Sequence, residues 1–322
     1  MAVKKEKSMT NKRTLKNRLL GFNLTDGWIF KICVYVLLIS MGYVFLYPLL
    51  RMISMSLMSQ QDIIDPEVSW IPTALAFENI RIAINVLDVP RTLINSFWFS
   101  ALLAILQTTV SAMTGYAFAI YNFKFKKFWF AMVLMTFIIP IPVLIIPRIM
   151  MFTTWQELTG ISLIGSIIPQ VGLSFLGQGV YSAILILICY NFFRLIPSVL
   201  EEAARIDGAG AWKVFWNIYI KMSATILLTV FLFAFVWNWN ETFITDRFVR
   251  GSVALLPQRL GGFNDVFGTL SVANNEMTGG NRLTEALQMS GTFISILPLL
   301  IIYAFVQRHF IEGIENSGIT GE

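Results

Sequence analysis

Charged residues are scarce in this chain. Asp, Glu, Lys and Arg make up 13% of its 322 residues, whereas 56% are hydrophobic. Soluble domains carry about a quarter charged residues, so this scarcity excludes an ordinary soluble domain and predicts a polytopic membrane protein. The net charge of +5 comes from the N-terminus and from short loops, which argues against a surface for nucleic acid.

Cysteine and histidine are almost absent. Cys33 and Cys189 both fall within apolar runs, and His309 is the single histidine, so we expect neither a disulfide framework nor a metal site. The phosphate-binding pattern G-x-x-x-x-G-K-[ST] is missing too, so nucleotide chemistry must belong to another chain. We therefore expect no catalytic residue and no cofactor here. Because ionisable residues stand only near span ends, at Lys31 and Arg148, an ion-coupled carrier is weakly supported.

Six apolar stretches are long enough to cross a bilayer, which takes about 20 helical residues. They predict an all-α protein with about six transmembrane helices. We expect one membrane domain, residues 28–308, between an N-terminal tail of residues 1–27 and a C-terminal tail of residues 309–322. The spans are residues 28–50, 92–120, 128–150, 163–193, 218–239 and 288–307, and the fourth is expected to break at its proline and glycines.

The distribution of Lys and Arg predicts the orientation. Of the 24 basic residues, 15 lie in the two tails and in the loops after the second and fourth spans. Cytoplasmic segments are enriched in Lys and Arg. We therefore expect both termini, and the loop of residues 194–217, in the cytoplasm.

That loop contains the polar stretch SVLEEAARIDGAGAWKVFWN, residues 198–217. Ser198 and Glu201 have the spacing of a capping box, and Glu201 with Arg205 forms a favourable i, i+4 pair. Gly208 suits a left-handed helix end. A second short helix, residues 211–217, is expected to follow at a new angle.

The first helix of the loop can have two uses. Val199, Ala203 and Ile206 form an apolar face, with Leu200 and Ala204 beside it. Such a helix can rest on lipid or pack on its own spans, or it can dock into a protein cleft. Helices that rest on lipid favour basic residues and bulky apolar groups, so the paired Glu and small Ala residues favour docking.

The stretch EEAARIDGAGAWKVFWNIYI resembles the EAA loop of permeases in binding-protein-dependent ABC importers, carbohydrate branch. Glu202, Ala203, Ala204 and Gly208 match in register, whereas Lys221 stands where Pro is usual. Further likenesses are Asn95-Ser96, Tyr116-Ala117 and FVWNWNETF. The ending resembles the tail of the maltose-type second permease, with matches at Gln307, Arg308, Phe310, Gly313 and Gly318.

The resemblance implies a type I importer permease in the bacterial cytoplasmic membrane. Its expected partners are a second homologous permease, two ABC ATPase subunits that bind ATP and Mg, an extracytoplasmic solute-binding protein and a sugar substrate, besides membrane lipid. The EAA helix would sit in a cleft of the ATPase. The implied coupling residues are Glu201, Glu202, Ala203, Ala204, Arg205, Asp207 and Gly208, with tail contacts at Gly313 and Gly318.

Polar and aromatic residues within the spans are candidates for the solute path. They are Gln107, Ser111 and Thr114, then Gln170, Ser174, Gln178 and Tyr181 around the expected break, and Trp237, Asn238 and Trp239 near the end of the fifth span. The polar ones can equally join helices by hydrogen bonds, and the tryptophans can form an interfacial belt. Two other functions stay open: an ATP-independent facilitator or secondary carrier, and a scaffold without a solute path.

Overall fold

The structure, a computed structural model, describes residues 27–273 and 281–316. These residues form helices, turns and bends, with no strand among them. Three helices are long and apolar enough to cross a membrane, and the number rises to six if each of three bent helix pairs is one span. The all-α membrane fold predicted from the sequence is therefore confirmed.

The chain divides into two compact units, which are described separately. The first contains the residues up to Asn79 and the segment Asn281–Phe293, and the second contains Ile80–Gly280 and the residues from Ile294. The last helix, α16 (Asn281–Asn316), contributes to both units.

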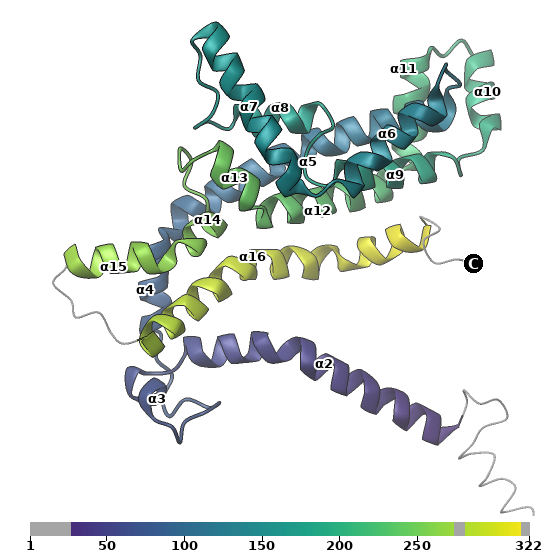
Figure 1. The fold of residues 1–322 in the computed structure, drawn as a ribbon. Helices are drawn as coiled ribbons and strands as arrows, with labels where there is room; N and C mark the ends of the chain where they lie inside the picture. The colour runs from purple at the N-terminus through teal and green to yellow at the C-terminus, as the bar shows by residue number, and fades with distance from the viewer. Residues whose placement is uncertain (1–26, 274–280, 317–322) are drawn as a thin grey trace, which may run out of the picture. The chain divides into compact units, whose positions relative to one another are not determined.

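The first unit is built on α2 (Trp28–Ser56), which Figure 1 draws in purple. Its 29 residues make a helix about 44 Å long, more than the ~30 Å of hydrocarbon. Buried side chains occur only at its C-terminal end, among residues 52–56. There Met55 packs with Met58, Ile63 of α3 (Gln60–Ile64) and Ala286 of α16. The rest of α2 exposes apolar side chains, as a helix facing lipid does.

The second unit is organised around α5 (Val89–Ile120), which α4 (Glu78–Leu87) precedes. It packs against α8 (Ile168–Phe175), α9 (Ser182–Phe193), α12 (Ala224–Asn240) and α14 (Leu256–Gly261). Gly115 lets α5 and α9 approach closely, because a Cβ there would lie 2.7 Å from Cβ of Cys189. Small residues at helix crossings allow such approaches in membranes.

Two of the expected spans are interrupted. The third consists of α6 (Lys126–Ile138) and α7 (Ile141–Thr159), which meet at 105°. Pro140 stands between them and cannot continue the hydrogen-bond ladder. The fourth consists of α8 and α9, separated by residues 176–181, where Gly177 has a φ of 72°.

A pair of short helices follows α9 at one end of the unit (Figure 1). α10 (Ser198–Ile206) lies at 74° to α9. α11 (Ala211–Val214) continues into a π-helix, η1 (Phe215–Ile220), where a regular helix over residues 211–217 was expected. η1 then meets α12 at 83°. Beyond α12, α13 (Phe243–Phe248) and α15 (Phe263–Ala273) complete the unit.

Candidate functional site

The helix α10 presents its apolar side chains to the surroundings. Val199 is 68% exposed, Leu200 41% and Ile206 87%. Ala203, Glu202 and the following Asp207 are exposed as well. A helix that exposes this much apolar surface beside charged groups has the composition of an interaction surface rather than of a core element.

The expected capping box at the start of α10 is wrong. Pro197 is the N-cap, and no side chain caps this end of the helix. Ser198 is already the first helical residue, so its hydroxyl is one position too late to accept the bond that a capping box needs. The predicted pair of Glu201 and Arg205 is confirmed, with Nη2 and Nε of Arg205 at 2.7 and 2.9 Å from Oε1 of Glu201.

The other end of α10 closes in the way that the glycine predicted. Gly208 has a φ of 81° and donates to the carbonyl of Arg205 at 3.1 Å. Ala209 donates to the carbonyl of Ala204 at 2.9 Å. These two bonds form a Schellman motif, which stops α10 sharply and turns the chain toward α11.

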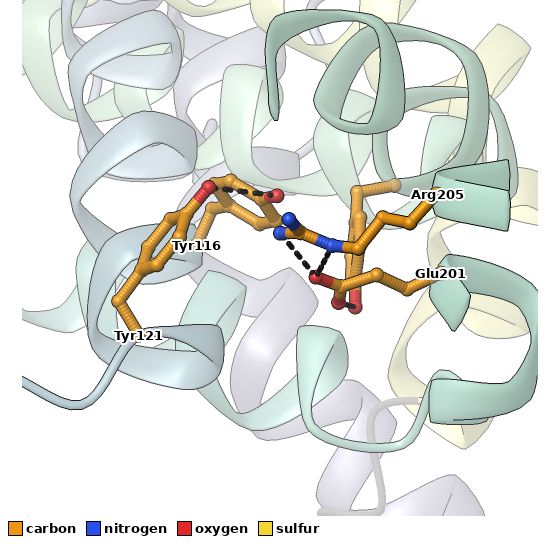
Figure 2. Close-up of polar contacts among 5 residues, drawn as sticks. Tyr116, Tyr121, Glu201 and Arg205 are labelled. Atoms are coloured by element: carbon orange, nitrogen blue, oxygen red, sulfur yellow. Dashed lines mark hydrogen bonds and ion pairs between the residues drawn. The ribbon is translucent and has the colours of Figure 1, made fainter. Parts of the chain in front are cut away.

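Glu201 fastens α10 to the rest of the unit. Its Oε1 accepts from Arg205, and its Oε2 accepts from the Tyr219 hydroxyl of η1 at 2.8 Å. Figure 2 shows Arg205 against Glu201, with Tyr116 and Tyr121 close by. Because both oxygens are engaged and the side chain is only 13% exposed, Glu201 faces inward while its neighbour Glu202 faces outward.

Aromatic rings extend this fastening to α5. The ring of Tyr116 lies 4.7 Å from that of Tyr219 and 4.9 Å from that of Phe215, between centroids. Phe193, at the end of α9, packs on both tyrosines. Tyr219 is fully buried. Contacts with α5, α9 and η1 therefore hold α10 in place. Sequence spacing could not have identified Tyr219 as a partner of Glu201, because the two residues are 18 positions apart.

Most of the polar residues proposed for a solute path are buried between helices. Gln107 of α5 donates to Ser174 of α8 at 3.4 Å and accepts from Asn238 of α12 at 3.2 Å. Gln170 pairs with Thr245 of α13 at 3.1 Å. These contacts match the alternative use, in which polar side chains join helices. Ser111 and Trp239 are also buried, and Thr114 is partly buried.

Gln178 and Tyr181 line a cavity of about 280 Å³. It lies between the bend of α6 and α7 and the break of α8 and α9, and Arg148 of α7 also lines it. Trp237 packs its ring on Tyr181 at a centroid distance of 5.0 Å. The sequence places Arg148 near the end of the expected third span. A lone cation within an apolar run was the signal that could have identified it.

Neither of the two expected tail contacts, Gly313 and Gly318, can be placed in a site. Gly313 falls in the last turns of α16, where only the backbone is described, and Gly318 lies outside the described residues. Among the residues that the structure describes, no group of three or more His, Cys, Asp or Glu is arranged as metal ligands would be.

Comparisons with known proteins agree on one family. The model of the family "Binding-protein-dependent transport system inner membrane component" matches residues 107–316. The arabinooligosaccharides transport system permease protein AraQ of Halalkalibacterium halodurans is 26% identical over 296 residues, which cover 88% of this chain and 96% of AraQ. The sn-glycerol-3-phosphate permease UgpE of Yersinia pestis is 24% identical, covering 88% of this chain and 95% of UgpE.

Two further proteins match the same share of this chain. The lactose transport system permease protein LacG of Rhizobium radiobacter is 25% identical, over 88% of this chain and 94% of LacG. A chain in the crystal structure of a bacterial ABC transporter that imports the acidic polysaccharide alginate superimposes with a TM-score of 0.71. That match covers 88% of this chain and 96% of the other at 21% identity, so it bears on the fold.

Proposed function

Because the chain belongs to the family of binding-protein-dependent transport system inner membrane components, we propose that it forms half of the translocation path of an ATP-driven carbohydrate importer. It is a multi-pass membrane permease rather than an enzyme. Relatives named for arabinooligosaccharides, lactose and sn-glycerol-3-phosphate support sugars and related polyols as the solute class. The ATP-independent facilitator is not favoured.

The observation that carries the proposal is the exposed face of α10 on a firmly held segment. Val199 and Ile206 offer apolar contact, and Glu202 offers an outward carboxylate for a basic residue of a partner. Glu201, Arg205 and Gly208 shape and hold the helix. A rigid helix docked in a cleft of the ATPase would pass closure of the ATPase subunits to the permease as rigid-body motion. In this way α10 would couple ATP hydrolysis to transport.

The partners in this proposal are a second permease, two ATPase subunits and an extracytoplasmic solute-binding protein. ATP and Mg bind to the ATPase subunits, and this chain holds no cofactor of its own. Both termini and the α10–α11 segment face the cytoplasm, as the Lys and Arg distribution indicates. The tail positions Gly313 and Gly318 would add contacts with the ATPase.

Charge reversal on α10 tests the docking surface. Glu202→Lys should reduce co-purification of the ATPase with the affinity-tagged permease by tenfold or more, because a like charge then meets the basic partner surface. Glu157→Lys is the matched control, since it changes another exposed Glu, on α7.

The outcomes separate the possible functions. Unchanged ATPase recovery with Glu202→Lys would contradict docking through α10. Solute uptake by the chain alone, without any ATPase or second permease, would instead support a facilitator. A complex whose ATPase responds to no solute-loaded binding protein would point to a scaffold.

A further inference from the structure

The cavity beside Arg148 lies where α8 and α9 are interrupted. Its lining includes Ser182, the first residue of α9, whose opposite end at Phe193 leads into α10. The 12 residues of α9 make about 18 Å of helix. If α10 is at the cytoplasmic surface, as the proposed function requires, the cavity lies more than halfway through a ~30 Å hydrocarbon core. A cavity at a helix break at this depth is where transporters hold solutes.

Arg148 places a positive charge on the wall of this cavity. Its Nη2 donates to the carbonyl of Gln178 at 3.2 Å and lies 3.5 Å from the Gln178 side-chain oxygen. A guanidinium carries five N–H donors, so these contacts leave most of its donor capacity unused. The described residues that line the cavity include no Asp or Glu. A cation in such a place is costly unless a partner compensates it.

Two more features of the cavity favour negative charge. The Ser182 hydroxyl is buried and has no hydrogen-bond partner among the described residues, although buried hydroxyls normally have one. Ser182 and Ala183, which both line the cavity, form the N-terminus of α9, where the helix dipole favours an anion.

A purely structural role explains Arg148 less well. Holding the break at Gln178 needs only a donor to a carbonyl oxygen, which an uncharged side chain can supply. A planar guanidinium is instead suited to binding carboxylate or phosphate through two parallel bonds. We infer that the Arg148 cavity binds an anionic group, carboxylate or phosphate, of the transported solute, with the Ser182 hydroxyl as an additional donor and the positive end of the α9 dipole beside it. This inference rests on the proposed function, because it names the solute class of that importer.

The local field of the cavity can be measured without knowing the solute. Thr136→Cys places a thiol on the cavity wall, in a Cys33→Ser background that removes the exposed native thiol while Cys189 stays buried. The assembled complex is labelled with an anionic and a cationic methanethiosulfonate of similar size. Adding Arg148→Gln should lower the anion-to-cation rate ratio several-fold, whereas Arg148→Lys should preserve it. Arg250→Gln, which removes an exposed cation outside the cavity lining, should leave the ratio unchanged.

Solute pairs that differ in charge then identify the anion. Proteoliposomes with the whole complex and its binding protein are given trigalacturonate or its methyl ester, and glycerol 3-phosphate or glycerol. We expect uptake of one acidic member, and Arg148→Gln should reduce it by about tenfold or more, as expected for a lost charged hydrogen bond. The uronate and phosphate arms distinguish the two sources of negative charge.

The failures are distinguishable. Uptake of neutral members only, unaffected by Arg148→Gln, would overturn the inference and leave the proposed function standing. A labelling ratio that ignores Arg148, or a Thr136→Cys thiol that neither reagent reaches, would also overturn it. An ATPase that responds to no solute-loaded binding protein in the wild-type complex would instead count against the proposed function itself.

Discussion

At the residue scale, the two adjacent glutamates of α10 have different surroundings. Glu201 turns inward to Arg205 and Tyr219, whereas Glu202 points outward. Adjacent positions on a helix are about 100° apart, so they cannot face the same way. One carboxylate can therefore hold the helix while the other stays available to a partner.

Removing the Tyr219 hydroxyl should loosen α10. Tyr219→Phe deletes a hydrogen bond to a carboxylate, which contributes about 1.5–3 kcal/mol at most, and it keeps the ring that packs on Tyr116. We expect a lower melting temperature of the purified permease and fewer solute molecules transported per ATP in the complex. Tyr121→Phe is the control, because its hydroxyl contact with Tyr116 is 3.5 Å long. Equal effects of the two variants would show that Glu201 needs no such bond.

The left-handed turn after α10 gives a graded prediction. Gly208 has a φ of 81°, and an added Cβ would meet nothing within 4 Å, so a substitution there costs backbone strain rather than space. Strain for an L residue is roughly 1–2 kcal/mol, and Asn tolerates this region best. Uptake and permease stability should fall in the order Asn, Ala, Val at position 208. An order that follows side-chain volume, with Ala above Asn, would contradict a strain mechanism.

Much of this local geometry was predictable from the sequence, because it depends on neighbours. The Glu201–Arg205 pair and the turn at Gly208 each follow from residues within one helical turn. The capping box failed because Pro197 takes the N-cap position. Tyr219 was not predictable, since its approach to Glu201 depends on the angle between α10 and η1.

At the element scale, close packing of α5 on α9 depends on one glycine. An added Cβ at Gly115 would lie 2.7 Å from Cys189 Cβ and 2.9 Å from the Tyr190 nitrogen, so even alanine must push the helices apart. Overpacking of this kind costs about 1–3 kcal/mol. Gly115→Ala should lower the melting temperature in detergent, whereas Gly42→Ala on α2, with nothing within 4 Å, should not. Equal melting temperatures would show that the crossing can relax.

In the first unit, the Asp62 carboxylate of the short α3 should make local stability depend on pH. Thr73 donates to the Asp62 carboxylate at 2.5 Å, and the Ser59 amide donates at 3.1 Å. The Thr73 bond is the main reason that the pKa of Asp62 lies below its ordinary value of 3.8, against the opposing effect of burial. A lowered pKa in the folded chain adds stability above the unfolded value and loses it as the pH falls through the folded pKa.

We therefore expect residues 59–73 to keep this stability above pH 3.8 and to lose it progressively as the pH falls from 3.8 through the lowered pKa of Asp62. Hydrogen exchange of this segment across the acid range checks the prediction. Asp62→Asn should open the segment at neutral pH and flatten its acid dependence. If hydrogen exchange of the segment in that variant still rose at acid pH as in the wild type, other carboxyl groups would be responsible for the opening.

The elements also show the limit of hydropathy. Runs of apolar residues predicted where membrane helices lie, but hydropathy carries no bend angle. The 105° turn between α6 and α7 depends on Pro140, and it helps to form the cavity that Arg148 lines. Because residues converge there from α6, α7, the connection between α8 and α9, α9 itself and α13, no single segment could reveal the cavity.

At the scale of the whole molecule, the six crossings expected from the sequence would put the two ends of the membrane domain on one side. Lys213→Cys in α11 should react with a membrane-impermeant maleimide only from the cytoplasmic face, and Asp65→Cys after α3 only from the outer face. Both positions are exposed, and the Cys33→Ser background removes the exposed native thiol. Labelling of both from the same face would contradict an odd number of crossings between them, and reversed labelling would contradict the proposed orientation.

The bonds of Glu201 have a consequence for building chimeric transporters. The α10 helix and the tyrosine that secures it both lie between residues 198 and 219, so a graft of that interval carries its own attachment. A recipient permease would have to supply aromatic rings where Tyr116 and Phe193 pack on Tyr219. The interval would be cut before Ser198 and after Ile220 and exchanged between related permeases. This exchange should change which ATPase subunit each permease binds and leave the solute that each one carries unchanged.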